Sequence, residues 1–263
     1  MTKKLRSKKK KAKNHAKSGL VAPKSAMVLA AGLGLRMRPI TDKTPKPLVT
    51  VAGRALLDHS LDRLVAAGVE KVVVNVHHLA EQIEQNLSRR KDLDIIVSSE
   101  KENLLETGGG VNKALAYFDD QPFYVSNADI LYLDGPDSAL HRLAESWQDD
   151  HMDCLLLMHS TVEAYGYKGD GDFMVDPGGR LERCPEREIS PYLFTGIQLL
   201  HPRLFNDSPD GAFSMNVLYD RAIEEERLFG IVHDGDWFHV GTAGGLAEAE
   251  IYMRQRFPGM RHR

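Results

Sequence analysis

Residues 29–48 of this 263-residue chain read L-A-A-G-L-G-L-R-M-R-P-I-T-D-K-T-P-K-P-L and are its most informative stretch. An apolar run over residues 26–31 leads into it and predicts a buried strand, and the glycines and prolines from 32 to 47 predict a loop. Glycines directly after a strand let backbone N–H groups come close to a polyphosphate. We therefore expect this loop to bind phosphate groups.

Two cations follow the glycines and strengthen this interpretation. Arg36 can hold phosphate oxygens in a bidentate fork, and Lys46 adds a positive charge on a backbone that prolines restrict on both sides. Met37 occupies the position of the third glycine of a Rossmann fingerprint, and no Walker A lysine is present. A plain strand-to-loop connection with surface cations is the alternative, but the glycines, the arginine and the lysine together favour a phosphate site.

Strands and helices alternate through about the first 160 residues. We expect strands at 71–76, 95–98, 123–125 and 154–158, and helices at 58–67, 79–87, 108–117 and 138–147. This order predicts β-α-β units, and therefore an α/β fold with a Rossmann-like, mostly parallel sheet flanked by helices. Farther along the chain, glycine and aspartate clusters predict short strands and a hairpin. The last elements that we expect are a strand at 192–200 and helices at 216–226 and 246–256.

The residues Asn127-Ala128-Asp129 follow the expected strand at 123–125. Ligands of open α/β sheets bind beyond the carboxyl ends of the strands, so we expect the Asp129 carboxylate to face the same crevice as the glycine loop. Mg²⁺ prefers oxygen ligands and takes one or two carboxylates together with substrate phosphates. An Asx turn that caps the next helix is the alternative. Beside a phosphate loop, Asp129 is the candidate metal ligand.

The motif L-A-A-G-L-G-L-R-M-R-P-I-T…T-P-K-P-L-V-T-V-A-G resembles the signature of sugar-1-phosphate nucleotidylyltransferases. The resemblance runs from about residue 26 to residue 256 and implies the nucleotide-diphospho-sugar transferase fold. It implies that Arg36, Lys46 and Asp129 are catalytic. Mg²⁺ on Asp129 is the implied cofactor, and Asn127 would touch the sugar phosphate. The loop residues that the resemblance places on the nucleoside triphosphate are Ala31, Gly32, Gly34, Leu35, Arg36 and Lys46.

The motif L-L-E-T-G-G-G at 104–110 opens an expected helix, where bare backbone groups can read the edge of a nucleobase. A flexible helix start is the alternative. The motif resembles the branch of the family that includes N-acetylmuramate-1-phosphate uridylyltransferases. The nucleotide contacts that this resemblance implies are Glu106, Thr107 and Gly108. The sugar contacts that it implies, within an expected sugar-binding subregion at 160–215, are Asp172, Thr195 and Gly196.

The chain departs from this family near its end, where W-F-H-V-G-T spans 237–242. The family has a second metal-binding aspartate at the position of His239. Imidazole is a poorer ligand for Mg²⁺ than a carboxylate and suits Zn, Mn or Co better. Three consequences stay open: Asp129 alone holds the metal, His239 binds a softer metal, or catalysis is weak. Asp236 is close in sequence, but residues 236 and 239 of an extended strand point to opposite faces.

The expected reaction is nucleotidyl transfer, and its substrates follow from the resemblance. UTP is the favoured nucleoside triphosphate, and N-acetylmuramate 1-phosphate is the favoured sugar 1-phosphate, as in cell-wall sugar recycling. GTP with a mannose or heptose 1-phosphate is the alternative pair for the same chemistry. A non-catalytic sugar-nucleotide sensor is an alternative from another class, and the histidine at 239 motivates it.

A basic tail precedes the expected domain. Residues 1–25 contain ten Lys or Arg and no Asp or Glu, which leaves 24 basic and 37 acidic groups in the rest of the chain. We expect a disordered tail at 1–25, a nucleotidyltransferase domain at 26–256 and a short tail at 257–263. Lysine-rich arms can bind RNA, but so acidic a body is unlike a nucleic-acid binder. A solubilising extension is therefore the favoured interpretation.

Composition and cysteine usage restrict the class of protein. Hydrophobic residues make up 42% of the chain and charged residues 27%, which is the usage of an ordinary globular protein. No apolar run approaches the roughly 18–20 residues of a membrane helix, so we expect no membrane partner. Cys154 and Cys184 lack a metal-ligand or redox spacing, which predicts a reducing, cytoplasmic location.

Overall fold

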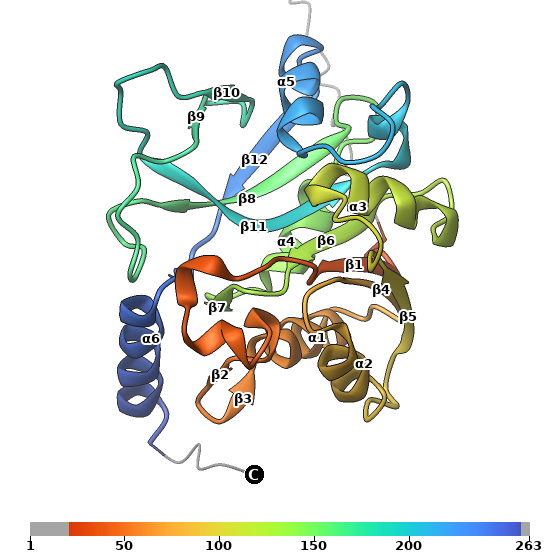
Figure 1. The fold of residues 1–263 in the computed structure, drawn as a ribbon. Helices are drawn as coiled ribbons and strands as arrows, with labels where there is room; N and C mark the ends of the chain where they lie inside the picture. The colour runs from red at the N-terminus through yellow and green to blue at the C-terminus, as the bar shows by residue number, and fades with distance from the viewer. Residues whose placement is uncertain (1–20, 259–263) are drawn as a thin grey trace, which may run out of the picture.

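The computed structural model describes residues 21–258, and a nine-stranded mixed sheet forms its centre (Figure 1). In spatial order the main strands are β5 (Asp94–Ser99), β4 (Lys71–Val76), β1 (Ser25–Leu29), β6 (Phe123–Asn127), β11 (Tyr192–Leu200), β8 (Cys154–Ser160) and β12 (Leu228–Val232). The first four of these strands are parallel, and β11 is antiparallel to both of its neighbours. This arrangement confirms the predicted α/β fold.

Six short strands complete the β structure. The hairpin of β9 (Phe173–Val175) and β10 (Leu181–Arg183) extends the main sheet from the start of β11, in the region where short strands were predicted. Two small sheets lie apart from it. They are formed by β7 (Leu131–Leu133) with β13 (Asp236–Phe238) and by β2 (Thr50–Val51) with β3 (Arg54–Ala55). The sequence pattern predicted neither small sheet, because strands of two or three residues show no periodicity.

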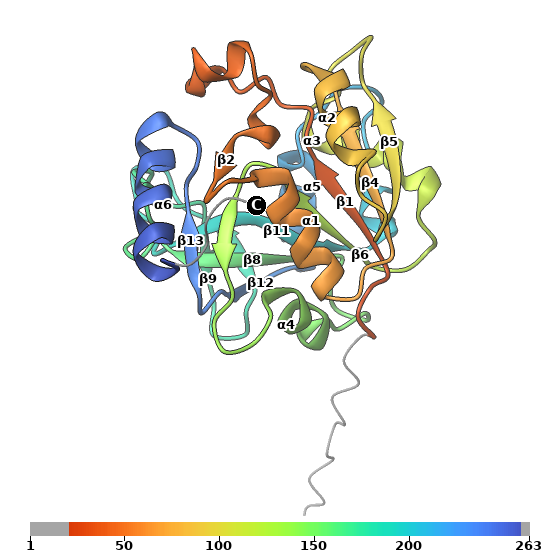
Figure 2. The same ribbon diagram turned by 90° about the horizontal axis from the view of Figure 1, so that it is seen from below.

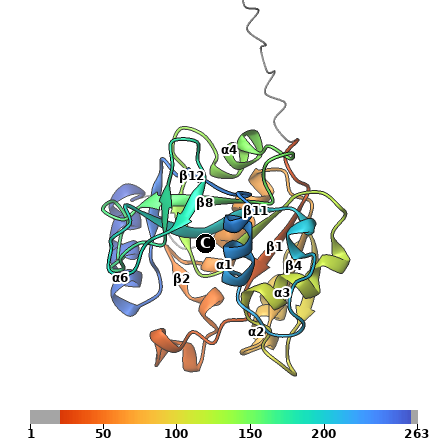
Figure 3. The ribbon, with the colours of Figure 1, turned by 90° about the horizontal axis from the view of Figure 1, so that it is seen from above.

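Helices cover both faces of the sheet, as the view from below and the view from above show (Figures 2 and 3). One core cluster contains residues of α1 (Leu56–Ala66), α2 (Ala80–Leu87) and α4 (Ala139–Ser146), and a second contains residues of α3 (Glu106–Ala114) and α5 (Asn216–Glu224). Within β4, Val72 and Val74 belong to the first cluster and Val73 to the second. A central strand with both faces buried was expected from its run of valines.

A third core cluster attaches α6 (Ala243–Arg256) to the rest of the domain. Ala249 and Met253 of this helix pack with Phe238 of β13 and with Met37 of the glycine loop. The helix begins three residues before the predicted start, because the Thr242 hydroxyl caps it by accepting a hydrogen bond from the Gly245 amide. Within residues 21–258, no helix combines the length and the apolar character needed to cross a membrane.

Both ends of the domain expected at residues 26–256 are packed against the rest of the structure. Strand β1 begins at Ser25, inside the predicted tail, because the Lys24 carbonyl already accepts hydrogen bonds from the amides at the start of β4. It ends at Leu29 rather than at residue 31, because the Ala30 amide donates to the Asn75 side chain. Phe257 packs against the third cluster, so the domain extends past residue 256. The predictions for residues 1–20 and 259–263 lie outside the described part of the chain.

We expect Leu61→Ala to lower the free energy of unfolding by about 2–5 kcal/mol, because Leu61 is fully buried between α1 and the sheet. Chemical denaturation followed by circular dichroism measures the change. Val162→Ala is the control, because that side chain is 91% exposed and its loss is expected to cost less than about 0.5 kcal/mol. Equal effects of the two substitutions would contradict the packing described above.

Candidate active site

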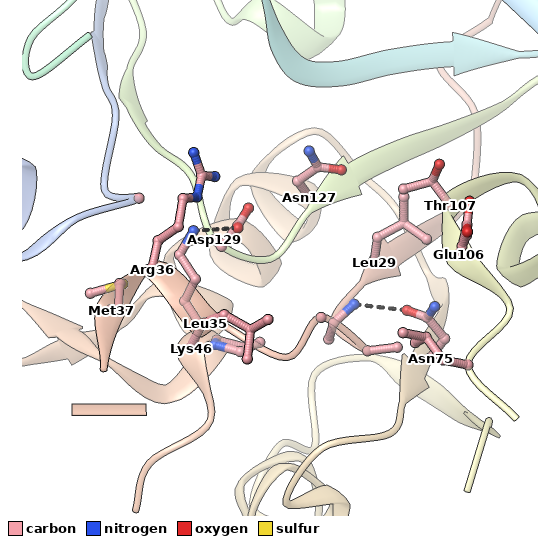
Figure 4. A pocket seen from close by; sticks show the side chains of 17 residues that line it. Leu29, Leu35, Arg36, Met37, Lys46, Asn75, Glu106, Thr107, Asn127 and Asp129 are labelled. Carbon is pink, nitrogen blue, oxygen red and sulfur yellow. Dashed lines mark hydrogen bonds and ion pairs between the residues drawn. The ribbon is translucent and has the colours of Figure 1, made fainter. Parts of the chain in front are cut away.

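A cavity of about 460 Å³ lies beyond the carboxyl ends of β1, β4 and β6, where ligands of α/β sheets bind (Figure 4). Three segments that are distant in the sequence form most of its walls: the glycine loop, the end of β6 and the start of α3. Asn75 of β4 and Gly241 complete them. The predicted site residues among its walls are Ala31, Gly32, Gly34, Leu35, Arg36, Lys46, Glu106, Thr107, Asn127 and Asp129. The structure therefore brings most of the predicted nucleotide-binding residues to one place.

The shape of the glycine loop depends on Gly34. Its φ of 65° lies in the left-handed region, and a Cβ atom there would come within 2.9 Å of the Thr41 methyl group. The Thr41 hydroxyl donates a hydrogen bond of 2.8 Å to the Gly34 carbonyl and closes the loop from inside. Met37 is almost fully buried in the third core cluster. This packing explains why a large apolar residue stands where a Rossmann fingerprint would have its third glycine.

An ion pair joins the loop to the end of β6. The Lys46 ammonium donates to Asp129 Oδ2 at 2.6 Å, and the Lys46 side chain is only 9% exposed. Figure 4 shows the Arg36 guanidinium beside this pair, pointing to the same part of the cavity. Among residues 21–258, none donates a hydrogen bond to the second oxygen of Asp129, whose side chain is 37% exposed. A carboxylate oxygen and two cations are thus available to one ligand.

His239 belongs to the same group of charges. Burial lowers the pKa of its imidazole below the ordinary value. The positive charges of Arg36 and Lys46 lower this pKa further, whereas the Asp129 carboxylate opposes them. Asp236 is directed elsewhere, because its carboxylate accepts a hydrogen bond from the Tyr252 hydroxyl of α6. The histidine therefore stands near Asp129, and Asp236 does not replace the carboxylate expected at position 239.

The glycine run at the start of α3 packs against the protein rather than presenting free amides. The amides of Gly108 and Gly109 both donate to the Phe213 carbonyl, at 2.8 and 3.1 Å. A Cβ atom on Gly108 would lie 2.3 Å from the Phe213 ring, so only glycine fits there. These two amides are engaged, which differs from the expectation that they read a nucleobase. Glu106 and Thr107, just before them, do line the cavity.

The predicted sugar residues lie outside the walls of this cavity, except for Asn127. Gly196 adjoins Asn127, since a Cβ atom on Gly196 would lie 2.7 Å from the Asn127 amide nitrogen. The Thr195 hydroxyl is buried and donates to the Leu157 carbonyl inside the sheet. The Asp172 carboxylate accepts a hydrogen bond from the Phe194 amide. The structure thus places Gly196 beside Asn127, and it commits the Thr195 hydroxyl to the sheet.

Asn75 also lines the cavity, although it was not among the site residues predicted from the sequence. Its side chain is 2% exposed and accepts a hydrogen bond of 2.7 Å from the Ala30 amide, where the glycine loop begins. The available signal was a polar residue in the middle of an otherwise valine-rich strand, K-V-V-V-N-V. A buried asparagine needs hydrogen-bond partners, and here a ligand loop supplies one of them.

Residues 25–256 match the family described as nucleotidyl transferase. The chain belongs to the nucleotidyl transferase family. It is 42% identical over 238 residues to N-acetylmuramate alpha-1-phosphate uridylyltransferase of Caulobacter vibrioides, a match that covers 89% of this chain and 98% of that protein. It is 37% identical over 229 residues to the protein of the same description in Neisseria meningitidis, covering 86% of this chain and 96% of the relative.

Solved structures agree with this nucleotidyltransferase assignment at the level of the fold. UDP-glucose pyrophosphorylase from Acinetobacter baumannii superposes with a TM-score of 0.73 at 18% identity, covering 90% of this chain and 95% of that one. The inositol-1-phosphate CTP transferase from T. maritima gives a TM-score of 0.71 at 17% identity, covering 90% and 98%. The nucleotidyltransferase described here therefore has the nucleotide-diphospho-sugar transferase fold that the sequence predicted.

We expect Arg36→Gln to raise the pKa of His239 in this nucleotidyltransferase, because the substitution removes a positive charge that disfavours the imidazolium. An NMR titration of the histidine ring protons, with a His239→Gln variant for assignment, measures the shift. Arg38→Gln is the matched control, because Arg38 pairs with Asp42 at 3.1 Å and is not among the charges that act on His239. An unchanged pKa in Arg36→Gln would place the guanidinium too far from the ring.

Proposed function

We propose that this nucleotidyltransferase transfers UMP from UTP to N-acetylmuramate 1-phosphate, with release of pyrophosphate. The observation that carries nucleotidyl transfer is the meeting of Arg36, Lys46 and Asp129 at one cavity beyond the strand ends. The choice of base and sugar is supported by the 42% identity to the Caulobacter uridylyltransferase, which this chain covers almost completely. The roles of the individual residues are part of the proposal.

In the proposed reaction a phosphate oxygen of the sugar 1-phosphate attacks the α-phosphorus of UTP. The new P–O bond forms as the bond to the bridging oxygen of the β-phosphate breaks, and pyrophosphate leaves with that electron pair. The attacking phosphate is already ionised near neutral pH, so no protein base has to remove a proton from it. Arg36 and Lys46 offset the negative charge that gathers on the triphosphate, and the walls of the cavity orient the two phosphates.

The residues at the cavity fit a divalent metal ion of the Mg²⁺ class. Asp129 supplies a hard carboxylate oxygen that accepts no hydrogen bond from the described residues, and Mg²⁺ takes one or two carboxylates plus phosphate oxygens and water. Asp129 is the residue that would hold the ion. His239, on whose pKa the Asp129 carboxylate acts, is the nearby imidazole that would add a ligand for a softer metal ion. When bound, such an ion neutralises phosphate charge and aligns the reacting groups.

The proposed substrates also suggest where the protein acts. A sugar uridylyltransferase of this kind would work in the cytoplasm on recycled cell-wall sugars. Both cysteines are free thiols, with Cys154 buried, and this supports a reducing compartment.

We expect pyrophosphate release from UTP, N-acetylmuramate 1-phosphate and Mg²⁺, and we expect Asp129→Asn to lower kcat on the order of 10²–10³-fold. Pyrophosphate is measured with a coupled assay, and the sugar nucleotide is identified by mass spectrometry. Asp42→Asn is the matched control, since Asp42 forms an exposed pair with Arg38. The same assay is run in parallel with GTP and mannose 1-phosphate or heptose 1-phosphate. Faster turnover of that pair would replace the proposed substrates, and no release with any pair would refute catalysis.

His239 stands at the position where the resemblance implies a metal-binding aspartate. We expect His239→Asp to lower the Mg²⁺ concentration for half-maximal turnover on the order of tenfold, because a carboxylate binds Mg²⁺ better than imidazole does. Manganese binding followed by electron paramagnetic resonance gives a readout independent of turnover. If the wild type is inactive and His239→Asp gains activity, the chain is a sensor with a degenerate catalytic site. Unchanged metal dependence would remove His239 from the metal site.

A further inference from the structure

Glu100 is a buried carboxylate for which the mechanism above has no use. It follows β5 directly, its side chain is 2% exposed, and no cation among residues 21–258 forms an ion pair with it. Both of its oxygens accept hydrogen bonds instead. Oε1 accepts from the Asn75 amide group at 2.7 Å, and Oε2 accepts from the Leu105 backbone amide at 2.9 Å. Burying a carboxylate is energetically unfavourable unless hydrogen bonds satisfy it. A role for Glu100 in the protein would explain why the carboxylate is buried here.

The hydrogen bonds continue through Asn75 to the glycine loop. Asn75 Oδ1 accepts from the Ala30 amide at 2.7 Å, a bond that is drawn as a dashed line in Figure 4. A chain of three hydrogen bonds therefore runs from Ala30 through Asn75 and Glu100 to Leu105. Ala30 lies at the start of the glycine loop, and Leu105 immediately precedes Glu106, which lines the cavity. The chain of hydrogen bonds thus connects the glycine loop to the cavity wall at residues 104–107 across the ends of two strands.

Gly110 of α3 lies directly against the hydrogen-bonded side chains of Asn75 and Glu100. A Cβ atom on Gly110 would lie 2.9 Å from the Asn75 amide nitrogen and 2.9 Å from Glu100 Oε1. Any residue larger than glycine at position 110 would push these two side chains apart. The third glycine of the run therefore serves the buried pair, whereas the first packs against Phe213.

We propose that Asn75 and Glu100 are a positioning pair that fixes the distance between the glycine loop and the wall at residues 104–107. The inference rests on the proposed function, because it takes these two walls to be the triphosphate and nucleobase sides of one nucleotide site. The pair acts on nucleotide binding through the two backbone segments. None of the hydrogen bonds of the pair within residues 21–258 goes to Asn127, so binding of the sugar 1-phosphate should not depend on these bonds.

The hydrogen-bond donors and acceptors allow a test by exchange. Glu100→Gln sets a second amide group against the donor of Asn75 or of Leu105, and Asn75→Asp sets two carboxylates against each other. In the double variant every bond can form again: the new aspartate accepts from Ala30 and from the new glutamine, whose oxygen accepts from Leu105. Charge and side-chain size are also conserved in the pair.

We expect each single variant to raise the KM for UTP and the calorimetric Kd for UTP on the order of tenfold. We expect kcat at saturating UTP and the KM for the sugar 1-phosphate to change less than about threefold. The double variant should return both UTP constants to within about threefold of the wild type. Tyr219→Phe is the control, because it removes a 2.8 Å bond to the buried Gln198 away from the cavity and should lower thermal stability without affecting UTP.

Several outcomes would overturn the inference while leaving the proposed function intact. The single variants could lose stability and still bind UTP like the wild type, as Tyr219→Phe should. The double variant could fold and fail to restore UTP binding, and this result decides the matter even if a single variant does not fold. A wild type that binds no nucleoside triphosphate in calorimetry would instead refute the proposed function, and the inference with it.

Discussion

The ion pair between Lys46 and Asp129 is the contact on which the organisation of the site depends. It joins a loop after the first strand to the end of β6, two segments separated by 83 positions in the sequence. A lysine ammonium that is 9% exposed needs a carboxylate beside it, and the loop cannot move away without leaving that charge unpaired. The pair therefore holds Arg36, Lys46 and Asp129 around the same volume.

Three features of the surrounding structure hold the residues of the site in place. Helices on both faces bury the parallel strands, and the register of these strands places Asn75, Leu29 and Asn127 side by side at one end of the sheet. The third core cluster holds Met37 and the segment after β13, which brings His239 to the same edge. The buried pair of Asn75 and Glu100 links the glycine loop to the wall at residues 104–107. A site built from loops is in this way supported by rigid elements.

Much of the fold was predictable because its signals are local. The limits of β4 and β11 were confirmed to the residue. The alternation of strands and helices predicted a mostly parallel sheet. Strands β7 and β13 escaped prediction because three-residue strands lack a period and are stabilised by pairing across 105 or so positions of sequence. The engaged amides of Gly108 and Gly109 escaped it because their partner, Phe213, lies in another part of the chain.

From the sequence alone, the family followed from the resemblance of the motif around Arg36 and Lys46. The strand–helix order and the position of the loop followed from local signals, because glycine conformation, proline restriction and hydrophobic period act within a few residues. The tertiary structure alone decided which side chains share the cavity. It showed that Asp236 is hydrogen-bonded to Tyr252 of α6, that the charges of Arg36 and Lys46 act on His239, and that Asn75 and Glu100 bridge two loops. These relations depend on contacts between residues distant in the chain, and no local pattern specifies such contacts.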